Sequence, residues 1–218
     1  MVPMPSVVKI SSSSLKCQLT DQPPEVTRRV DNIGRATDSM SAIVDRCIEL
    51  ERLDRGEQSI HLSECILLDV VTALDVVCGP DNPRLRIELN DVDSVLADRH
   101  LLEVALGNLL DNALKYALPG APITLRSDAE QRGGKPGFRL SVDNRVAAGS
   151  APGAGQVFVR YFRGANAHDV SGTGLGLYLT RELARLQGGD ADYRCGPEGR
   201  VSFSIWLPAP DYPPEAEQ

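Results

Sequence analysis

The sequence predicts an α+β fold, a two-layer α/β sandwich preceded by a helical arm. Apolar residues at heptad-like spacing run through residues 26–54, which indicates the arm. Beyond the arm, segments of period-two alternation occur around two segments of helical periodicity, at 98–117 and 174–187. This order is typical of helices that cover one face of a mixed sheet. A chain of 218 residues has room for one core domain and such an arm.

The arm is predicted as a single helix over residues 26–54. Pro23 and Pro24 precede it, as is usual at a helix start, and Arg55-Gly56 ends it. Charged residues occupy the faces outside the apolar seam, so the seam is available for pairing with a second helix. The alternative is a lone amphipathic helix that packs on its own domain. The seam consists of Val26, Val30, Ile33, Thr37, Met40, Val44 and Cys47.

The remaining elements follow from the two hydrophobic periodicities. We expect strands at 59–62, 84–89, 94–97, 122–127, 137–143, 190–195 and 200–207. We expect helices at 64–76, 98–117, 155–162 and 174–187.

A glycine-rich turn precedes the last predicted helix and is the most informative segment for function. Residues 172–177 are Gly-Thr-Gly-Leu-Gly-Leu, so the glycines lie where a loop enters a helix. Glycine lets backbone N–H groups approach a polyphosphate closely, and the positive end of the following helix favours the anion. Taken alone, such a segment is more often only a tight turn.

The predicted helix at 98–117 carries a polar stripe beside its leucine-rich stripe. Asn108, Asn112 and Lys115 lie at i, i+4 and i+7 and therefore share one side of the helix. Two asparagines one turn apart lower helix stability. A functional explanation is that their amide oxygens face a hard cation and its phosphates, with Lys115 as a nearby charge. The alternative is an ordinary solvated polar face.

Together these segments resemble the catalytic ATP-binding domain of sensor histidine kinases, which has the Bergerat-type fold also found in the Hsp90, gyrase and MutL ATPases. The resemblance implies that fold, with ATP and Mg²⁺ as cofactors. Four boxes occur in the family's order across residues 58–208. They are the N box at 108–116, the F box at 158–164, the G2 box at 171–177 and the closing strand at 199–208.

The resemblance implies roles for the N-box residues, of which Asn108 and Lys115 are the catalytic candidates. Asn112 would ligate Mg²⁺ that bridges the phosphates, with Asn108 close to the same site. Lys115 would contact phosphate, and Tyr116 would lie against the nucleotide. The superfamily's ATPases carry a water-activating Glu at the position of Asn108, and an amide cannot act as a general base. The resemblance therefore implies phosphoryl transfer to a side chain, which depends on positioning and charge neutralisation.

The adenine-binding box departs from the family. Residues 140–144 alternate like a strand that ends in an acidic residue. The family has an Asp there that accepts a hydrogen bond from the adenine amino group, so Asp143 is the candidate. The family's Gly-x-Gly turn is replaced by residues 145–148, Arg-Val-Ala-Ala, which cannot adopt positive φ as freely. The alternative is that Asp143 is a plain strand-end residue.

Residues 164–172 resemble the family's ATP lid, a loop that closes over the phosphates. Arg163 could bind phosphate through its guanidinium fork, whereas we expect His168 to be solvated. The remaining candidates for nucleotide binding are Gly172, Thr173, Gly174, Leu175, Gly176 and Ser202.

The arm resembles the second helix of the dimerisation and phosphoacceptor hairpin of histidine kinases. The first helix should carry a phosphoacceptor His box, yet the histidines are His61, His100 and His168, all within or after the ATP-binding region. Residues 5–15 resemble the segment that comes after such a box. We therefore expect the chain to begin just past the phosphoacceptor, or the box to have degenerated, so that this chain does not autophosphorylate in the usual way.

Composition predicts a cytoplasmic protein, and the resemblance implies that this can be the cytosolic part of an inner-membrane sensor kinase. The net charge of −7 disfavours nucleic-acid binding and direct membrane contact. The five cysteines lack CxxC or metal-ligand spacing, which indicates reduced thiols. No apolar run reaches the roughly 20 residues that span a bilayer.

We therefore expect three regions: a partial dimerisation region at 1–56, an ATP-binding domain at 57–208 and a disordered tail at 209–218. The predicted function is transfer of the γ-phosphoryl group of Mg-ATP to a histidine elsewhere, for relay to a response regulator. The expected partners are that regulator and either a second copy, bound through residues 26–54, or a fuller kinase chain. One alternative is a nucleotide-binding pseudokinase or dimerising scaffold. Another is a Bergerat-type ATPase, against which Asn108 argues.

Overall fold

The structure is a computed structural model that describes residues 24–56, 59–74, 82–90, 92–164 and 172–209. The chain divides into two compact units, 1–57 and 58–218. We describe each unit by itself. The predicted lid residues 165–171, the segment 5–15 and the tail from residue 210 lie outside the described residues.

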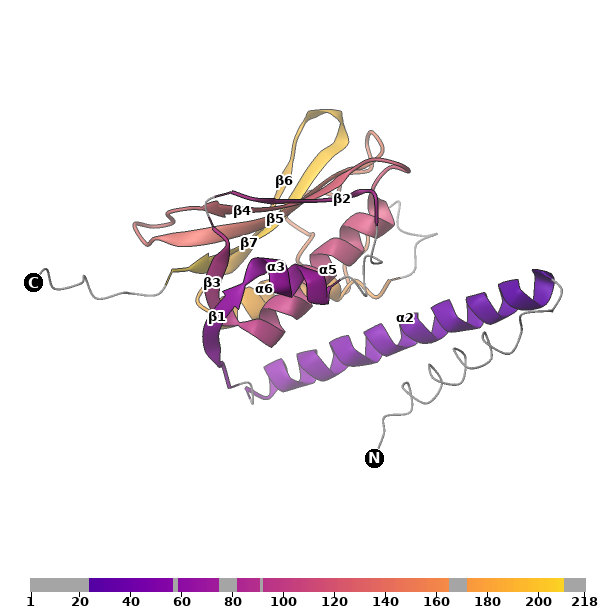
Figure 1. Cartoon of the computed structure of the whole chain (residues 1–218), viewed down its shortest axis with the longest axis horizontal. Coiled ribbons are helices and arrows are strands. Elements are labelled where there is room, and N and C mark those ends of the chain that lie inside the picture. Colours follow the sequence, from indigo (N-terminus) through magenta and orange to yellow (C-terminus); the bar gives the residue numbers. More distant parts are fainter. Residues whose placement is uncertain (1–23, 57–58, 75–81, 91, 165–171, 210–218) are drawn as a thin grey trace, which may run out of the picture. The chain divides into compact units, whose positions relative to one another are not determined.

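The first unit contains the long helix α2, Pro24–Asp54 (Figure 1). The predicted helix at 26–54 is thus confirmed to within two residues of its start. Ile33, Met40 and Val44, three of the predicted seam residues, are exposed. These exposed apolar residues belong to the predicted apolar stripe of the helix.

The second unit contains a five-stranded sheet in the spatial order β2-β4-β5-β7-β6. β2 pairs with β4 in parallel, and the other neighbours are antiparallel. The strands are β2 (Leu85–Leu89), β4 (Ile123–Ala129), β5 (Gly137–Arg145), β7 (Arg200–Pro208) and β6 (Asp190–Cys195). A short 3-10 turn, Pro197–Gly199, joins β6 to β7.

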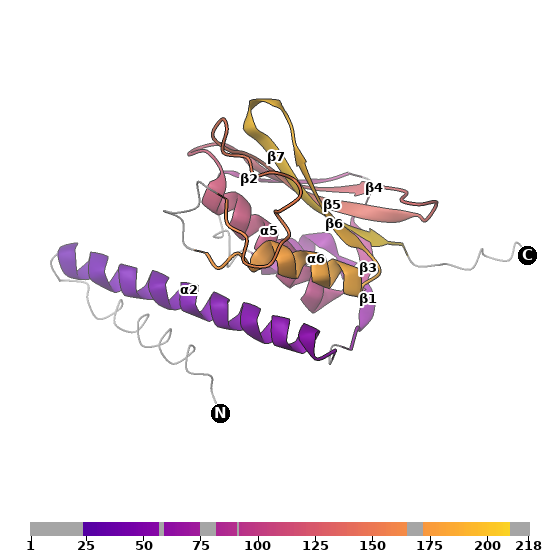
Figure 2. The ribbon, with the colours of Figure 1, turned by 180° about the vertical axis from the view of Figure 1, so that it is seen from behind.

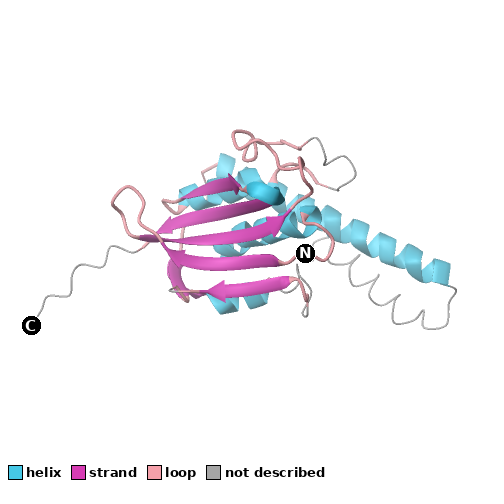
Figure 3. Cartoon of the chain, turned by 90° about the horizontal axis from the view of Figure 1, so that it is seen from above, coloured by secondary structure: helices cyan, strands magenta, loops and turns pink. Residues whose placement is uncertain are grey.

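Two helices, α5 (Arg99–Tyr116) and α6 (Gly176–Leu186), pack side by side against one face of this sheet. Figure 3 shows the sheet with the helices behind it, and Figure 2 shows α6 beside α5 from the opposite side. The short helix α3 (Leu67–Ala73) also packs on α5. The arrangement is the predicted two-layer sandwich. Among the described residues, no helix is both long and apolar enough to cross a membrane.

A second, two-stranded sheet is formed by β1 (Leu62–Ile66) and β3 (Ser94–Asp98), which pair antiparallel. At the end of β3, Asp98 caps α5 by accepting a hydrogen bond from the backbone N–H of Leu101 at 3.2 Å. Its second carboxylate oxygen accepts from the backbone N–H of His61 at 2.9 Å. The backbone N–H of Asp98 donates to Oε1 of Gln187 at 2.8 Å, just past α6. One residue therefore joins the start of α5 to β1 and to the end of α6.

The hydrophobic core lies between the sheet and the two long helices. Strand residues alternate, so every second side chain of β5 and β7 faces the helices. Fully buried side chains from both layers fill the space: Leu102, Leu106, Leu109, Leu110, Leu140, Val142, Leu179, Leu183 and Ile205.

Four predicted elements differ from the structure. The strand at 59–62 and helix at 64–76 were placed too early, because β1 pairs with β3 at Leu62–Ile66 and α3 follows it. The helix predicted near 155–162 is wrong, since these residues form turns. The glycines at 153 and 155 favour turns over a helix. The last helix starts at Gly176, two residues late, because Gly174 has φ +71°.

Candidate functional site

Asn108, the first residue of the polar stripe of α5, faces the N-terminus of α6. Asn108 is buried, and a Cβ built on Gly176 would lie 3.3 Å from Asn108 Oδ1. Thr180 fixes this approach, because its hydroxyl donates to the carbonyl of Gly176 at 3.0 Å and lies 3.4 Å from the carbonyl of Ala105 on α5. The predicted N box and G2 box are therefore adjacent in space.

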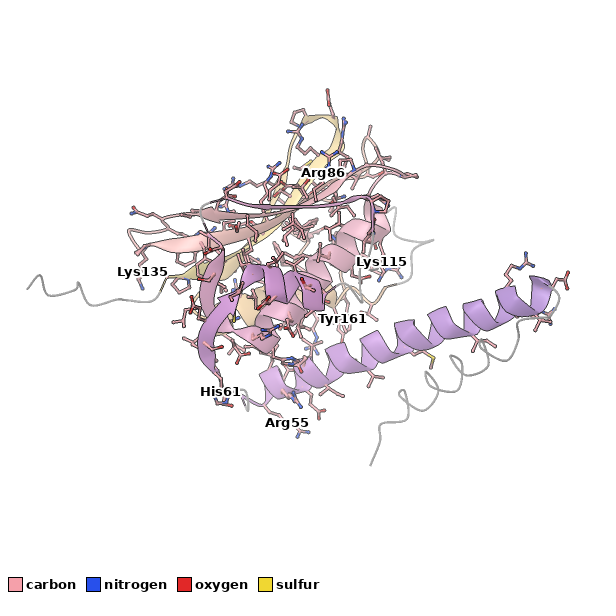
Figure 4. The ribbon with its side chains drawn as sticks, in the orientation of Figure 1. Arg55, His61, Arg86, Lys115, Lys135 and Tyr161 are labelled. Atoms are coloured by element: carbon pink, nitrogen blue, oxygen red, sulfur yellow. The ribbon has the colours of Figure 1, made fainter. Side chains whose placement is uncertain are left out.

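The stripe becomes more exposed towards the C-terminal end of α5. Asn112, one turn beyond Asn108, is half-buried, and Lys115 is exposed. Lys115 Nζ forms an ion pair with Asp111 Oδ2 at 2.8 Å within the same helix. Such pairs are weak, so the ammonium can exchange this carboxylate for a phosphate at low cost. Figure 4 shows Lys115 near the end of α5, on the side of the unit away from Lys135 in the β4–β5 turn.

Tyr116 and Arg163 interact electrostatically at the same end of α5. Burial raises the pKa of the Tyr116 phenol, while the Arg163 guanidinium lowers it and Asp111 raises it. The phenol is therefore neutral near neutral pH and remains a hydrogen-bond donor. The structure thus brings Arg163 from the predicted F box near the predicted N box.

The glycine-rich turn is fixed by backbone contacts with the F box. Gly174 has φ +71°, and a Cβ there would lie 2.6 Å from both the carbonyl oxygen of Phe162 and the carbonyl carbon of Tyr161. Its carbonyl accepts a hydrogen bond from the backbone N–H of Tyr161 at 3.0 Å. Tyr161 itself has φ +64°, which is unusual for a residue other than glycine. Gly174 is therefore required to pack the two segments together, a reason that the sequence does not reveal.

The start of α6 provides backbone donors. Leu175, which precedes the helix, is buried, and no side chain caps this helix in the described residues. The N–H groups in the first turn of a helix have no partners within it, and the helix dipole favours an anion there. Gly172 and Thr173 are half-buried beside this turn. Thr173 Oγ1 is buried and has no hydrogen-bond partner among the described residues.

Two arginines that the sequence analysis missed hold the F box against α6. The Arg160 guanidinium lies over the rings of Tyr161 and Tyr178, 5.4 and 5.8 Å from their centroids. Arg181 lies 4.9 Å from the centroid of Phe158 and pairs with Asp190 at 2.8 Å. The spacing of Tyr178 and Arg181, three apart on one helix face, was the available signal.

Asp143 and Ser202 lie on the face of the sheet that the helices do not cover. They stand opposite each other in the β5–β7 register, and strand alternation places them between the buried core positions. The Asp143 carboxylate pairs with Arg126 at 3.3 Å, and Arg126 also pairs with Glu88 at 2.7 Å. The structure therefore does not bring these two predicted nucleotide-binding side chains to the polar stripe of α5.

Asn144 is the polar residue of β5 that follows the buried row. It is 4% exposed, and neither Nδ2 nor Oδ1 has a hydrogen-bond partner among the described residues. The carbonyl of the next residue, Arg145, accepts from the backbone N–H of Leu118 at 2.7 Å, which places this strand end beside the end of α5. Sequence reasoning missed Asn144, although its parity with Leu140 and Val142 was a signal that could have identified it.

The described residues contain no group of three or more His, Cys, Asp and Glu side chains that could hold a metal ion. The predicted metal ligand is an amide, that of Asn112, and it stays a prediction. His168 lies outside the described residues. His61 Nε2 lies 3.0 Å from Ser59 Oγ.

Comparison with protein families matches residues 97–211 to the family described as histidine kinase-, DNA gyrase B-, and HSP90-like ATPase. The chain is 29% identical over 199 residues to the sensor protein CreC of Escherichia coli K12, which covers 85% of this chain and 39% of CreC. It is 30% identical over 203 residues to the signal transduction histidine-protein kinase AfsQ2 of Streptomyces coelicolor, which covers 89% of this chain and 35% of AfsQ2. The chain spans between 31% and 50% of the length of the first curated relatives that it matches.

Among solved structures, full-length ShkA in complex with AMPPNP is similar, with a TM-score of 0.62 and 19% identity. The match covers 97% of this chain and 48% of that one. At this identity the likeness shows the fold.

Proposed function

This chain belongs to the family of histidine kinase-, DNA gyrase B- and HSP90-like ATPases, and we propose that within this family it is the catalytic ATP-binding portion of a two-component sensor histidine kinase. The fold is the predicted Bergerat ATP-binding fold. The relatives named above, CreC and AfsQ2, are a sensor protein and a histidine-protein kinase, which supports the kinase branch of the family.

The observation that carries this proposal is the close approach of Asn108 on α5 to Gly176 at the start of α6. This approach places amide oxygens and backbone N–H groups at one location. Amide oxygens suit a hard cation, and helix N-termini suit phosphates. The combination therefore suits the Mg²⁺-bound phosphates of a nucleotide. The relative ShkA, whose structure contains AMPPNP, supports the choice of ATP.

Each candidate residue has a proposed contact with the nucleotide or its metal. Asn112 would ligate Mg²⁺, with Asn108 beside it, and the backbone of residues 174–176 would bind phosphate oxygens. Lys115 and Arg163 would neutralise phosphate charge, and Tyr116 would lie against the nucleotide. Bound Mg²⁺ would polarise the phosphoryl oxygens and neutralise their charge.

Phosphoryl transfer requires positioning more than acid–base chemistry. Asn108 can orient a ligand but cannot remove a proton from water. We therefore propose that the γ-phosphoryl group passes to a histidine outside a recognisable box in this chain rather than to water. A response regulator would then receive it. The arm would pair with a second copy or a fuller kinase chain, in the cytoplasm and without nucleic acid or direct membrane contact.

A scaffold without phosphotransfer is the alternative function. It is favoured by the Arg-Val-Ala-Ala sequence at 145–148, where the family has a glycine turn. Calorimetric titration with a non-hydrolysable ATP analogue, with and without Mg²⁺, separates the two functions.

The proposed function predicts Mg²⁺-dependent binding that Asn112→Ala abolishes without loss of folding, because Asn112 is half-buried and lies outside the buried core. The matched control is Gln131→Ala, an exposed amide in the β4–β5 turn. Absence of binding at millimolar nucleotide favours the scaffold, and binding that persists in Asn112→Ala overturns the metal assignment.

A further inference from the structure

The end of β5 separates two neighbouring polar residues onto opposite faces of the sheet. Leu140 and Val142 are buried on the helix side, and Asn144 continues their row. Directly opposite Asn144 in the register stands Val201, which is also buried. Asp143 lies between these positions and therefore points to the uncovered face, where it pairs with Arg126. Asn144 is thus the polar side chain that this strand end directs towards the helices.

The amide of Asn144 differs from the hydroxyls of two other buried residues of this unit, Ser127 and Thr180. Ser127 and Thr180 are equally buried, and their hydroxyls donate to backbone carbonyls at 2.6 and 3.0 Å. Both polar atoms of Asn144 are buried with no partner among the described residues. An unbonded buried amide destabilises a fold, and it is explained where a ligand supplies the missing bonds.

Asn144 lies at the opposite end of the candidate site from the start of α6. Its strand end is beside residue 118, just past the last turn of α5. Asn108, by contrast, lies two turns back along α5, against Gly176. Eight residues of helix separate Asn108 from Tyr116, a rise of about 12 Å. This separation fits a nucleotide whose phosphates are at Asn108 and whose base is near Asn144.

Of the parts of a nucleotide, the base is the one that can form hydrogen bonds with both polar atoms of the amide. A phosphate only accepts hydrogen bonds and would leave Oδ1 unbonded, whereas a metal ion would bind Oδ1 and leave Nδ2 unbonded. A purine edge offers a donor and an acceptor side by side, and asparagine bonds such an edge through both atoms. Adenine presents its 6-amino group as donor beside N1 as acceptor.

A 6-oxopurine presents the reverse order, with O6 as acceptor and N1–H as donor. Rotation of the terminal amide by half a turn exchanges Oδ1 and Nδ2, so asparagine can satisfy either order. An ionised carboxylate accepts only, and it would face O6 with like partial charge. An amide at this position is therefore less selective than a carboxylate.

We propose that Asn144 recognises the purine base, and that its amide allows the site to bind 6-oxopurine nucleotides as well as adenine nucleotides. This inference rests on the proposed nucleotide-binding function. Asp143 has no contact with the base.

The test is competition of ADP and IDP, with Mg²⁺, against a fluorescent adenine nucleotide bound to the full chain. The two ligands differ only at position 6 and N1 of the base. For the native chain we expect dissociation constants within about tenfold of each other. For Asn144→Asp, measured at about pH 8 to ionise the new carboxyl, we expect IDP to weaken at least about tenfold relative to ADP. Gln131→Glu, the same amide-to-carboxyl change at an exposed position, is the control and leaves the ratio unchanged.

The outcomes separate the two proposals. If neither nucleotide binds the native chain, the proposed function fails and this inference fails with it. If ADP binds but IDP is about 100-fold weaker on the native chain, the inference is overturned while the function stands. The inference is also overturned, and the function stands, if Asn144→Asp leaves the ratio of the IDP and ADP dissociation constants unchanged. That result is expected where the amide only binds a buried water. The native ratio needs no variant, so the test remains decisive even if Asn144→Asp does not fold.

Discussion

At the start of α6 the proposed site is built mainly from backbone that hydrogen bonds and close packing hold in place, whereas at the end of β5 it contains a buried amide. We call the first region, defined by Asn108 and Gly176, the phosphate end, and the second, defined by Asn144, the base end. Thr180 is hydrogen-bonded at the phosphate end, while the amide of Asn144 has no partner among the described residues. Substitutions should therefore affect folding at the phosphate end and ligand selection at the base end.

The largest expected effect is at the phosphate end. Gly174→Val places a β-branched side chain at φ +71° and 2.6 Å from the backbone of residues 161–162. Both the strain and the collision destabilise the fold, so we expect a loss of about 3 kcal/mol or more and loss of nucleotide binding. Urea unfolding measures the first and calorimetry the second.

The control for this substitution is Gly153→Ala, where no heavy atom lies within 4 Å of the new Cβ and φ is not positive. Its stability should match that of the native chain. Native-like stability in Gly174→Val would mean that the two boxes are not packed as described.

The next effect contrasts two buried polar residues. Asn144→Leu removes unbonded polar atoms, so we expect the free energy of unfolding to stay the same or rise by about 1 kcal/mol. Thr180→Val removes a hydrogen-bonded hydroxyl and should lower the free energy of unfolding by about 1 kcal/mol. Urea unfolding of both variants measures this difference in sign. If Asn144→Leu is the more destabilised of the two, the amide has a partner in solution, and the base end is not as distinct as we infer.

A smaller effect is expected at Lys115. Its ion pair with Asp111 joins two partly exposed side chains, 33% and 27% accessible. Lys115→Met should therefore change the free energy of unfolding by less than about 0.5 kcal/mol. It should still weaken nucleotide binding, more strongly for ATP than for ADP if the ammonium contacts the terminal phosphate. Equal loss for both nucleotides would place Lys115 away from that group.

The smallest effect concerns the phenol of Tyr116. Burial raises the pKa of Tyr116 and the guanidinium of Arg163 lowers it, so Arg163→Gln should raise this pKa further. A raised folded-state pKa stabilises the protein below the unfolded pKa of about 10, and this stabilisation is lost as pH rises through the folded value. Ultraviolet titration, with Tyr116→Phe to identify the signal, measures the shift. A lower pKa in Arg163→Gln would contradict the placement of the two residues.

Helices could be predicted from the sequence more accurately than contacts between segments. The extent of α5 follows from its leucine stripe and from Asp98 as N-cap, both of which are local signals. The start of α6 was misplaced because the left-handed conformation of Gly174 depends on packing against Tyr161 and Phe162. No periodicity in the sequence specifies such a contact.

The strand end shows a different limit. The bounds of β5 are predicted nearly correctly, but the resemblance points to the acidic residue Asp143, which strand parity places on the opposite face from the buried row. The buried positions Leu140 and Val142 point to Asn144 as the residue that faces the helices. The shift of β1 has another cause, since its pairing with β3 is made across about 30 residues of chain.

The contacts of Asp98 bear on how this protein can be dissected for biochemical work. The family match starts at residue 97, and a fragment cut there would contain every element from α5 onward. It would lack β1, the antiparallel partner of β3, and the backbone N–H of His61 that occupies one oxygen of the Asp98 carboxylate. The smallest fragment that preserves the start of α5 therefore begins before residue 61, more than 30 residues ahead of the segment that defines the family.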